Sequence, residues 1–335
     1  MARNGPKYRV LVTDFVWPST APEQEVLAQI GAEIIEAPDP SEETLTSLAA
    51  DADAILTCFA QVTPKVVQSA GKCLVISRYG VGVDNIAVDV ATREGIAVTY
   101  VPDYCVDEVS DHVMALLLAW NRQVGFYDGM AKKGRWEGVR SPVPLVRLRG
   151  RTMGIVGLGR IGRVVASKAR TFGLELMGYD PYLPPDAQLP EGLRLVDLPT
   201  LLAESDYVTL HPPLNQDTRG LIGAEQFGQM KSSAFIINCA RGPIIDEAAL
   251  CAALSNGQIA GAGLDVMEDA VPAANHPLFA MDNVLVTPHV AFLSQQSVHE
   301  LEVRTAQATV DVLQGRMPEF LINPAVLAHS RVQLA

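Results

Sequence analysis

Arg241 and His289 are the residues in this 335-residue sequence whose types best suit chemistry. Each comes shortly after an apolar run that is typical of a buried strand. A histidine titrates near neutral pH, so His289 can give or take the proton of a hydroxyl group. A guanidinium presents a rigid fork of donors, so Arg241 can hold a carboxylate. The alternative is that His289 is a cap after a strand and Arg241 a surface ion-pair residue.

A glycine-rich motif upstream favours the chemical interpretation. The motif GLGRIG at residues 157–162 follows an apolar run, precedes a helical pattern, and is followed eighteen residues later by Asp180. Gly157 permits a tight turn, Gly159 lets a pyrophosphate approach the backbone, and Gly162 lets the helix pack closely on the strand. The N-terminus of that helix offers N–H groups to phosphates. A carboxylate at Asp180 can bind the ribose hydroxyls and repels a 2′-phosphate, which favours NAD over NADP.

The motif lies within a pattern of six expected strands, as a full dinucleotide-binding sheet requires. Two flank the motif, and the other four are expected at Asp206–Leu210, Ala234–Asn238, Ile259–Leu264 and Val284–Thr287. In an open parallel sheet the ligand binds outside the carboxyl ends of the strands. The polar residues that follow these four strands, and that should share that edge, are His211, Arg241, Asp265 and His289.

The first hundred residues predict a second, smaller α/β domain, because short apolar runs alternate there with amphipathic stretches. The loop 78–84 contains two glycines and follows an expected strand. Its N–H groups could converge on an anion such as a carboxylate. The alternative is an ordinary strand-to-helix turn capped by Asp84.

A helix is expected after Asp103, where apolar residues recur at helical spacing. The stretch Gln123–Arg151 that follows is less regular and rich in lysine and arginine. A nucleic-acid-binding tract is one interpretation, and a solvated or subunit-spanning arm is the favoured one. Trp136 and the apolar segment Val143–Val146 would suit an interface between subunits.

Composition excludes several classes of protein. The net charge of −12 and the pI of about 5.0 argue against a nucleic-acid-binding surface. Five cysteines without CxxC spacing indicate reduced thiols and a cytoplasmic location. The longest apolar run, Val113–Trp120, is too short to span a membrane. The histidines show no metal-ligand pattern, so no metal ion is expected.

Six motifs in order resemble the D-isomer-specific 2-hydroxyacid dehydrogenase family: VGLGRIG, YDP, HPPLNQDTRGLI, NCARGPIIDEAAL, GAGLDV and TPHVA. The likeness runs from about Tyr79 to Asn323. The stretch VPDYCVDEVSDHVMALLLAWNR resembles the branch close to the C-terminal-binding-protein corepressors. The resemblance implies a flavodoxin-like substrate domain built from both chain ends (1–102 and 298–335) and a central Rossmann NAD-binding domain (103–297). It also implies a homodimer formed through the helix after Asp103 and the following arm.

The resemblance also assigns roles to residues. It makes His289 the acid–base and Arg241 the substrate-orienting arginine, with the N–H groups of Val81 and Gly82 binding the substrate carboxylate. It places Asp265 near the nicotinamide carboxamide. The residues expected to contact the cofactor are Gly157, Gly159, Arg160, Ile161, Gly162, Asp180, His211, Pro212, Thr218, Cys239, Ala240, Arg241, Asp265 and His289.

One residue departs from the family pattern. Ala270 stands where the family usually carries a glutamate that pairs with the catalytic histidine. Glu268 and Asp269 are close by, and either could substitute for that carboxylate. Loss of an adjacent carboxylate removes a charge that favours the imidazolium, so we expect reduction at neutral pH to be weaker than is usual in the family.

Together these patterns predict an NAD-dependent oxidoreductase that interconverts a small 2-keto acid and its D-2-hydroxy acid. A D-3-phosphoglycerate dehydrogenase is an alternative within that class, although no extra cationic cluster marks a phosphate site. The alternative from another class is an NAD-sensing, corepressor-like binding protein with weak residual dehydrogenase activity. The residues expected around the substrate indicate a moderately apolar pocket without specifying the acid: Cys58, Phe59, Tyr79, Tyr104 and Phe292.

Overall fold

The computed structural model describes residues 7–136, 140–184 and 186–335. The chain forms two compact units. Unit 1 comprises the chain up to Tyr104 and from Ser294 onward, and unit 2 comprises Cys105–Leu293. The expected domain limits, after residues 102 and 297, differ from these by two and four residues. Residues 137–139 of the expected arm lie outside the described residues.

Unit 1 contains a five-stranded parallel sheet in the order β2-β1-β3-β4-β5. Its strands are β1 (Tyr8–Val12), β2 (Ala32–Glu36), β3 (Ala54–Thr57), β4 (Val75–Arg78) and β5 (Ala97–Thr99). This order is that of the flavodoxin-like doubly wound fold, in which ligands bind where the strand order reverses. The prediction of a second α/β domain is therefore confirmed.

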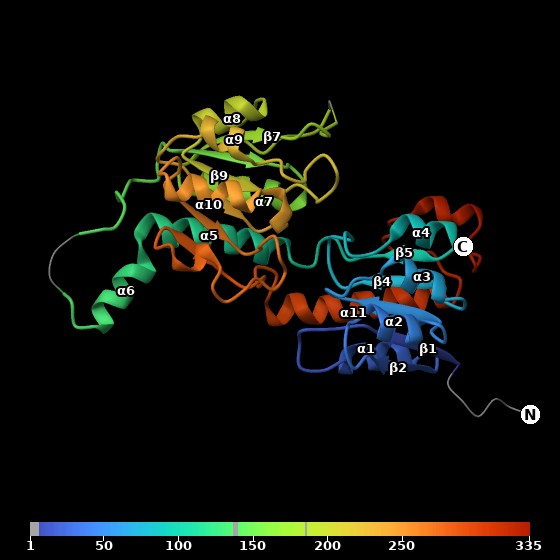
Figure 1. The fold of residues 1–335 in the computed structure, drawn as a ribbon. Coiled ribbons are helices and arrows are strands. Elements are labelled where there is room, and N and C mark those ends of the chain that lie inside the picture. The colour runs from blue at the N-terminus through green and yellow to red at the C-terminus, as the bar shows by residue number, and fades with distance from the viewer. Residues whose placement is uncertain (1–6, 137–139, 185) are drawn as a thin grey trace, which may run out of the picture. The chain divides into compact units, whose positions relative to one another are not determined.

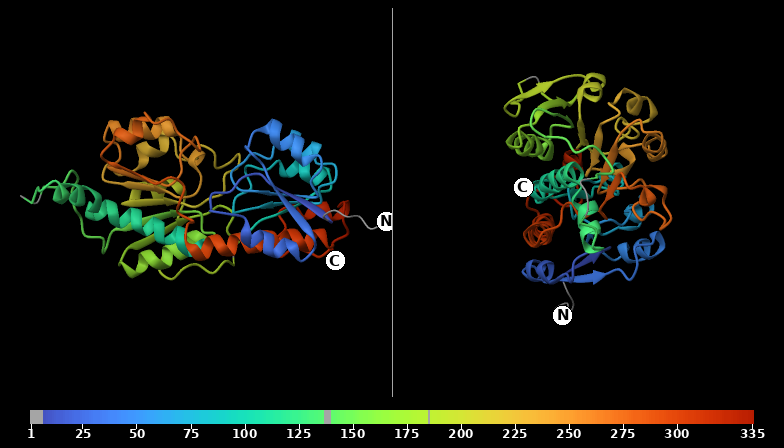
Figure 2. Two further views of the ribbon diagram at one scale, coloured as in Figure 1. Left: turned by 90° about the horizontal axis from the view of Figure 1, so that it is seen from below. Right: turned by 90° about the vertical axis from the view of Figure 1, so that its left-hand side faces the viewer.

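Helices cover both faces of this sheet. The helices are α1 (Ala21–Ala28), α2 (Glu42–Ala49), α3 (Pro64–Ser69), α4 (Val88–Arg93) and α11 (Gln295–Leu313), followed by the short 3-10 helix η3 (Pro324–Ala328). The α2, α3 and α4 helices pack in sequence on one face, whereas α11 packs beside α1 and against β4 (Figure 2). Unit 1 is thus assembled from segments at opposite ends of the chain.

Two buried carboxyl groups face each other where α1 meets α11. Glu23 of α1 is fully buried, and Glu302 of α11 is 6% exposed. The Tyr79 hydroxyl donates to Glu23 Oε1 over 2.9 Å. Burial and the nearby Glu23 raise the pKa of Glu302 to about 7. Folded unit 1 therefore holds a proton that an unfolded glutamate releases near its ordinary pKa of 4.5.

We expect this proton to make stability fall as pH rises from about 4.5 to about 7, since the folded state binds the proton more tightly than the unfolded state does. The contribution is fully present below the unfolded pKa and is lost as pH rises through the folded pKa. The Glu302→Gln substitution should remove this pH-dependent contribution. Between about pH 5 and pH 8 the Tm of the wild type should therefore drop by a few degrees more than the Tm of the variant. Glu25→Gln, at an exposed position on α1, is the control. Equal drops in all three proteins would contradict the prediction.

Unit 2 contains a seven-stranded parallel sheet in the order β12-β11-β10-β9-β6-β7-β8. Its strands are β6 (Thr152–Val156), β7 (Glu175–Tyr179), β8 (Leu193–Leu195), β9 (Tyr207–Leu210), β10 (Phe235–Asn238), β11 (Gly261–Leu264) and β12 (Val284–Val286). The six expected strands are all present. The prediction missed β8, a three-residue edge strand, because two of its side chains are exposed and it carries no apolar run.

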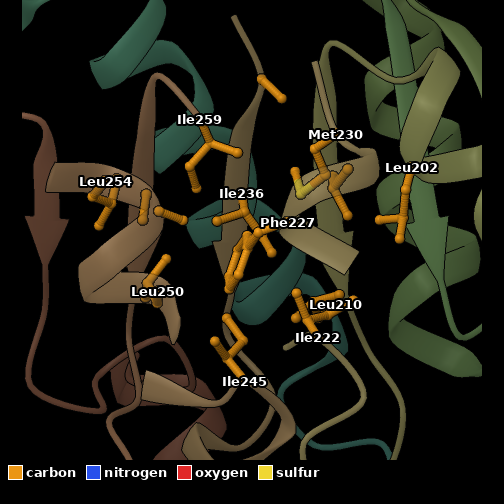
Figure 3. Packing of buried hydrophobic residues seen from close by; sticks show 14 of the residues in the cluster. Leu202, Leu210, Ile222, Phe227, Met230, Ile236, Ile245, Leu250, Leu254 and Ile259 are labelled. Carbon is orange, nitrogen blue, oxygen red and sulfur yellow. The ribbon is translucent and has the colours of Figure 1, made fainter. Parts of the chain in front are cut away.

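Two groups of helices enclose this sheet (Figure 1). The helices are α5 (Val106–Arg122), α6 (Val124–Lys132), α7 (Arg160–Thr171), α8 (Leu198–Glu204), α9 (Ala224–Gln229) and α10 (Glu247–Ser255). The α5 and α7 helices form one core with the sheet, and α8, α9 and α10 form the other. Phe227 and Ile236 lie at the centre of the second core (Figure 3). On the other side, Trp120 stacks on Phe235 with ring centroids 4.6 Å apart.

The stretch after Gln123 is more regular than expected at its start. Gln123 adopts a positive φ of 50° and ends α5, and α6 begins at the next residue. The expectation of a less regular stretch is wrong for Val124–Lys132, which form α6 although their apolar residues follow no buried stripe, whereas residues 133–136 and 140–151 contain no helix or strand. Within unit 2, Val124 and Phe126 of α6 are 57% and 41% exposed, and Trp136 is 82% exposed.

Candidate dinucleotide-binding and catalytic site

The glycine motif forms the turn between β6 and α7. A Cβ on Gly157, which has a φ of 90°, would lie 2.8 Å from the backbone carbon of His211. A Cβ on Gly162 would lie 2.1 Å from the Gly157 carbonyl oxygen. A Cβ on Gly159, in contrast, would meet no atom of the described residues within 4 Å, its own chain neighbours apart. Two glycines are therefore required by the protein's own packing, and the third leaves open space beside the helix N-terminus.

The first turn of α7 faces that open space. Gly159 is the N-cap residue, and the first N–H groups of α7, from Arg160 onward, have no acceptor within the helix. Such a helix end binds phosphate groups through its N–H groups and its partial positive charge. The residues present therefore fit a dinucleotide pyrophosphate.

Asp180 follows β7 and contacts the motif directly. Its Oδ2 accepts from the Leu158 N–H over 2.9 Å, and its Oδ1 accepts from the Tyr182 N–H over 3.0 Å. The half-buried carboxylate thus braces the glycine turn. The sequence carries no signal of this contact, since no pattern indicates a hydrogen bond across 22 residues.

The segment after β9 supplies a neutral imidazole. Burial lowers the pKa of His211 to about 4, so this side chain is uncharged at neutral pH. Its Nε2 lies 2.9 Å from the Thr209 hydroxyl oxygen. Pro212 follows directly, and the buried Thr218 hydroxyl donates to the Pro213 carbonyl over 2.6 Å. Thr218 therefore holds the shape of this segment.

Arg241 is held in a tight turn after β10. Asn238, which is 1% exposed, accepts from the Ala240 N–H over 3.0 Å and donates to the Arg241 carbonyl over 2.9 Å. A Cβ on Gly242 would lie 1.8 Å from the Met267 carbonyl oxygen, so this turn packs directly on the segment after β11. Asn238 was not among the predicted site residues, although its place at the end of an expected strand is a signal for such a role.

Asp265 organises the loop that carries His289. Its Oδ1 accepts from the Thr287 hydroxyl over 2.6 Å and from the Val290 N–H over 3.0 Å. Its Oδ2 accepts from the Ala291 N–H over 2.9 Å, and its carbonyl oxygen accepts from the His289 N–H over 2.8 Å. His289 itself has a positive φ of 54°, a conformation that non-glycine residues hold only where their surroundings fix it.

The strand order brings the proposed chemical groups to one edge. β11 pairs with β10 on one side and with β12 on the other, and all three strands are parallel. Arg241, Asp265 and His289 therefore leave the same edge of the sheet on three neighbouring strands. His211 leaves this edge after β9, the next strand along.

The segment after Asp265 carries the departure from the family pattern. Glu268, Asp269 and Ala270 are exposed. Neither the Glu268 carboxylate nor the Asp269 carboxylate makes a hydrogen bond or an ion pair with any described residue. Instead, Glu247 anchors the segment at two points, since its carboxylate accepts from the Glu268 N–H over 3.0 Å and lies 2.8 Å from His276 Nε2.

Unit 1 contributes a separate anion-binding candidate at the end of β4. The Arg78 guanidinium donates to the carbonyls of Tyr79 and Gly82 and fixes the loop 78–84. The N–H groups of Val81 and Gly82 donate to no acceptor among the described residues. Asp84 does not cap a helix here, because α4 begins at Val88 with Ala87 as its N-cap residue.

Several other kinds of site find no support in the described part of the chain. Burial raises the pKa of the Cys58 and Cys73 thiols to about 12, and burial together with Asp265 raises that of Cys239 well above its usual range, so none of the three is a thiolate at neutral pH. The described residues contain no group of three or more histidine, cysteine or acidic side chains placed to hold a metal ion. None of their helices combines the length and apolar character needed to cross a bilayer.

The doubly wound sheet, the glycine turn and the polar strand ends define unit 2 as a dinucleotide-binding domain. Residues 114–291 match the family model described as the NAD-binding domain of D-isomer specific 2-hydroxyacid dehydrogenases. The chain belongs to this family, which confirms the resemblance seen in its motifs.

Individual relatives agree with this assignment. The chain is 37% identical to a glyoxylate reductase of Korarchaeum cryptofilum, over 87% of this chain and 89% of that one. It is 39% identical to a D-3-phosphoglycerate dehydrogenase of Methanocaldococcus jannaschii, over 94% of this chain but only 59% of the relative. The structure superposes on that of a D-lactate dehydrogenase from Aquifex aeolicus, complexed with NAD and lactic acid, with a TM-score of 0.83 and 27% identity over 92% of this chain and 96% of that one. These relatives give the corepressor interpretation no support.

Proposed function

We propose that this protein is an NAD-dependent dehydrogenase that interconverts a small 2-keto acid and its D-2-hydroxy acid. One observation carries the proposal: the glycine turn, Arg241, Asp265 and His289 all leave the carboxyl edge of one parallel sheet. A nicotinamide cofactor bound along that edge supplies the hydride. The protein must then orient the substrate and manage one proton.

The residues of this chain divide those tasks. Arg241 binds the substrate carboxylate or the oxygen that gains charge, through a fork of charged donors. His289 gives a proton to that oxygen during reduction and takes it back during oxidation. Val81 and Gly82 offer N–H donors that suit a carboxylate. The neutral His211, with Pro212, Cys239, Ala240 and Thr218, borders the cofactor.

Cofactor choice follows from Asp180. Its carboxylate disfavours the 2′-phosphate of NADP and accepts hydrogen bonds from the ribose hydroxyls of NAD. The open space at Gly159, with Arg160, Ile161 and Gly162 in the first turn of α7, accommodates the pyrophosphate. Glu268 and Asp269 remain the candidates for the carboxylate that Ala270 lacks.

We also infer a homodimer and a cytoplasmic location. The exposed apolar side chains of α6 and Trp136 support an interface through α5, α6 and the arm. The scattered, unbridged cysteines support a reducing compartment.

A keto-acid panel tests the proposed function. Glyoxylate, hydroxypyruvate, pyruvate, phenylpyruvate and, in the oxidative direction, 3-phosphoglycerate are each assayed with NAD(H) and with NADP(H). We expect at least one acid to be turned over at 1 per second or faster, in the range typical of enzymes, with NADH preferred to NADPH. Turnover below about 0.01 per second on every acid, with NADH still bound, would identify an NAD-sensing binding protein instead.

A further inference from the structure

A histidine on another element contacts the loop that carries His289. His112 lies on α5, and its side chain is 21% exposed. His112 Nε2 is 2.9 Å from the Thr287 hydroxyl oxygen and 3.6 Å from Asp265 Oδ1. These contacts join residues 175 and 153 positions apart. No motif of the sequence assigns His112 a role.

The direction of each hydrogen bond follows from the number of available protons. The Thr287 hydroxyl has one hydrogen, and it lies 2.6 Å from an Asp265 oxygen that, when ionised, can only accept. That hydrogen is therefore committed to Asp265. The Thr287 oxygen can then only accept from His112, so His112 Nε2 must carry a hydrogen. The contact thus fixes the protonated nitrogen of His112 and creates a directed chain from His112 through Thr287 to Asp265.

This chain ends on the carboxylate that fixes the His289 loop. Asp265 is 1% exposed and receives its hydrogen bonds from Thr287, Val290 and Ala291. Among the residues that the structure describes, His112 is the basic side chain that lies within ion-pair distance of it. A buried carboxylate is costly without donors or a cation nearby. His112 therefore supports, through Thr287, the set of hydrogen bonds that holds this carboxylate and the loop in place.

We propose that His112 is a positioning residue for His289, acting through Thr287 and Asp265. The inference rests on the proposed function, because it assigns His112 a part in the same proton transfer. His289 has a positive φ, and a strained backbone conformation of this kind persists only where several contacts fix it together. The loop should therefore be sensitive to the loss of one of the hydrogen bonds that hold it. Removing this donor from α5 would weaken one end of the hydrogen-bond chain and leave the hydrogen bonds from the Val290 and Ala291 N–H groups to Asp265 in place.

Two substitutions separate a positioning role from simple packing. His112→Leu fills the space without a donor, whereas His112→Gln places an N–H donor where Nε2 stands. We expect His112→Leu to lower kcat for the best keto acid at least about tenfold, the effect of losing one hydrogen bond to a charged network, while the KM for that acid changes less than threefold. His112→Gln should restore kcat to within about threefold of the wild type. His299→Leu, at an exposed position on α11, is the control and should leave kcat unchanged.

Equal kcat values for the leucine and glutamine variants would overturn the proposal, whether both are active or both impaired. A second measurement does not depend on turnover. In protein labelled with ¹⁵N-histidine, the His112 resonances, assigned as those lost in His112→Gln, should show a proton on Nε2 at neutral pH. A neutral ring with its proton on Nδ1 would overturn the proposal even if no keto acid were reduced. If the wild type turns over no keto acid but His112 carries the expected Nε2 proton, the proposed function is wrong. The hydrogen-bond chain from His112 through Thr287 to Asp265 is then still supported.

Discussion

Replacing His289 by asparagine should lower kcat for the best keto acid by roughly 10²- to 10⁴-fold, the range that general acid–base catalysis contributes. Asparagine cannot supply a proton at neutral pH, so the developing alkoxide must take its proton from water. Asparagine also tolerates the positive φ of 54° at this position better than most residues do. The loop held by Asp265 should therefore keep its conformation, and the loss should lie in the chemical step. Steady-state kinetics with NADH measures it.

Two further measurements test whether the loss lies in the chemical step rather than in cofactor binding or folding. The Kd for NADH should stay within about threefold of the wild-type value, and the Tm should be nearly unchanged. His299→Asn, at an exposed position, should behave as the wild type. A fall in kcat of less than tenfold for His289→Asn, with NADH still bound, would remove His289 from the role of acid–base and leave Arg241 as the principal chemical group.

Gly159→Ala should weaken NADH binding at least about tenfold without lowering the Tm. The backbone at Gly159 is extended, with φ −71° and ψ −163°, so alanine fits it without strain. Apart from its own chain neighbours, no described residue has an atom within 4 Å of the added Cβ, so the substitution should not disturb the packing around this turn. The methyl group would instead occupy the space in which the pyrophosphate approaches the backbone. Fluorescence titration with NADH and a thermal melt measure the two quantities.

Two other glycine-to-alanine substitutions serve as controls for Gly159→Ala. Gly228→Ala adds a Cβ to α9 in equally open space and should change neither NADH binding nor, by more than a degree or two, the Tm. Gly162→Ala should lower the Tm as well as the affinity, because its Cβ would lie 2.1 Å from a backbone oxygen. If Gly159→Ala binds NADH as the wild type does, the pyrophosphate does not lie at this turn.

The sequence predicted those parts of the fold that depend on local pattern. Buried parallel strands read as short apolar runs, so the six strands expected in unit 2 are present and the α/β alternation of unit 1 was recognised. The edge strand β8 and the helix α6 were missed, because neither has the apolar run or buried stripe by which such elements are recognised. The convergence of Arg241 and His289 on one sheet edge followed from the rule that ligands bind at the carboxyl ends of parallel strands.

The supporting contacts of the site could not be predicted in this way. Asp180 was expected to face a ribose, and the structure shows that it also holds the Leu158 and Tyr182 N–H groups. His112 reaches Thr287 across 175 residues, and a contact of that span leaves no periodic signal in the sequence. Residues that could do the chemistry are thus recognisable by type, whereas residues that orient them are found only once the chain is folded.

The division of unit 1 between distant segments has a consequence for synthesis on the ribosome. Its sheet is complete once Thr99 has emerged, but the β4 face and α1 still await α11, which is made after the whole of unit 2. Unit 2 is continuous and can fold as soon as it leaves the exit tunnel. A nascent chain stalled before Gln295 would therefore carry a folded nucleotide domain together with a sheet face that α11 has not yet covered, and exposed apolar surface of this kind favours aggregation.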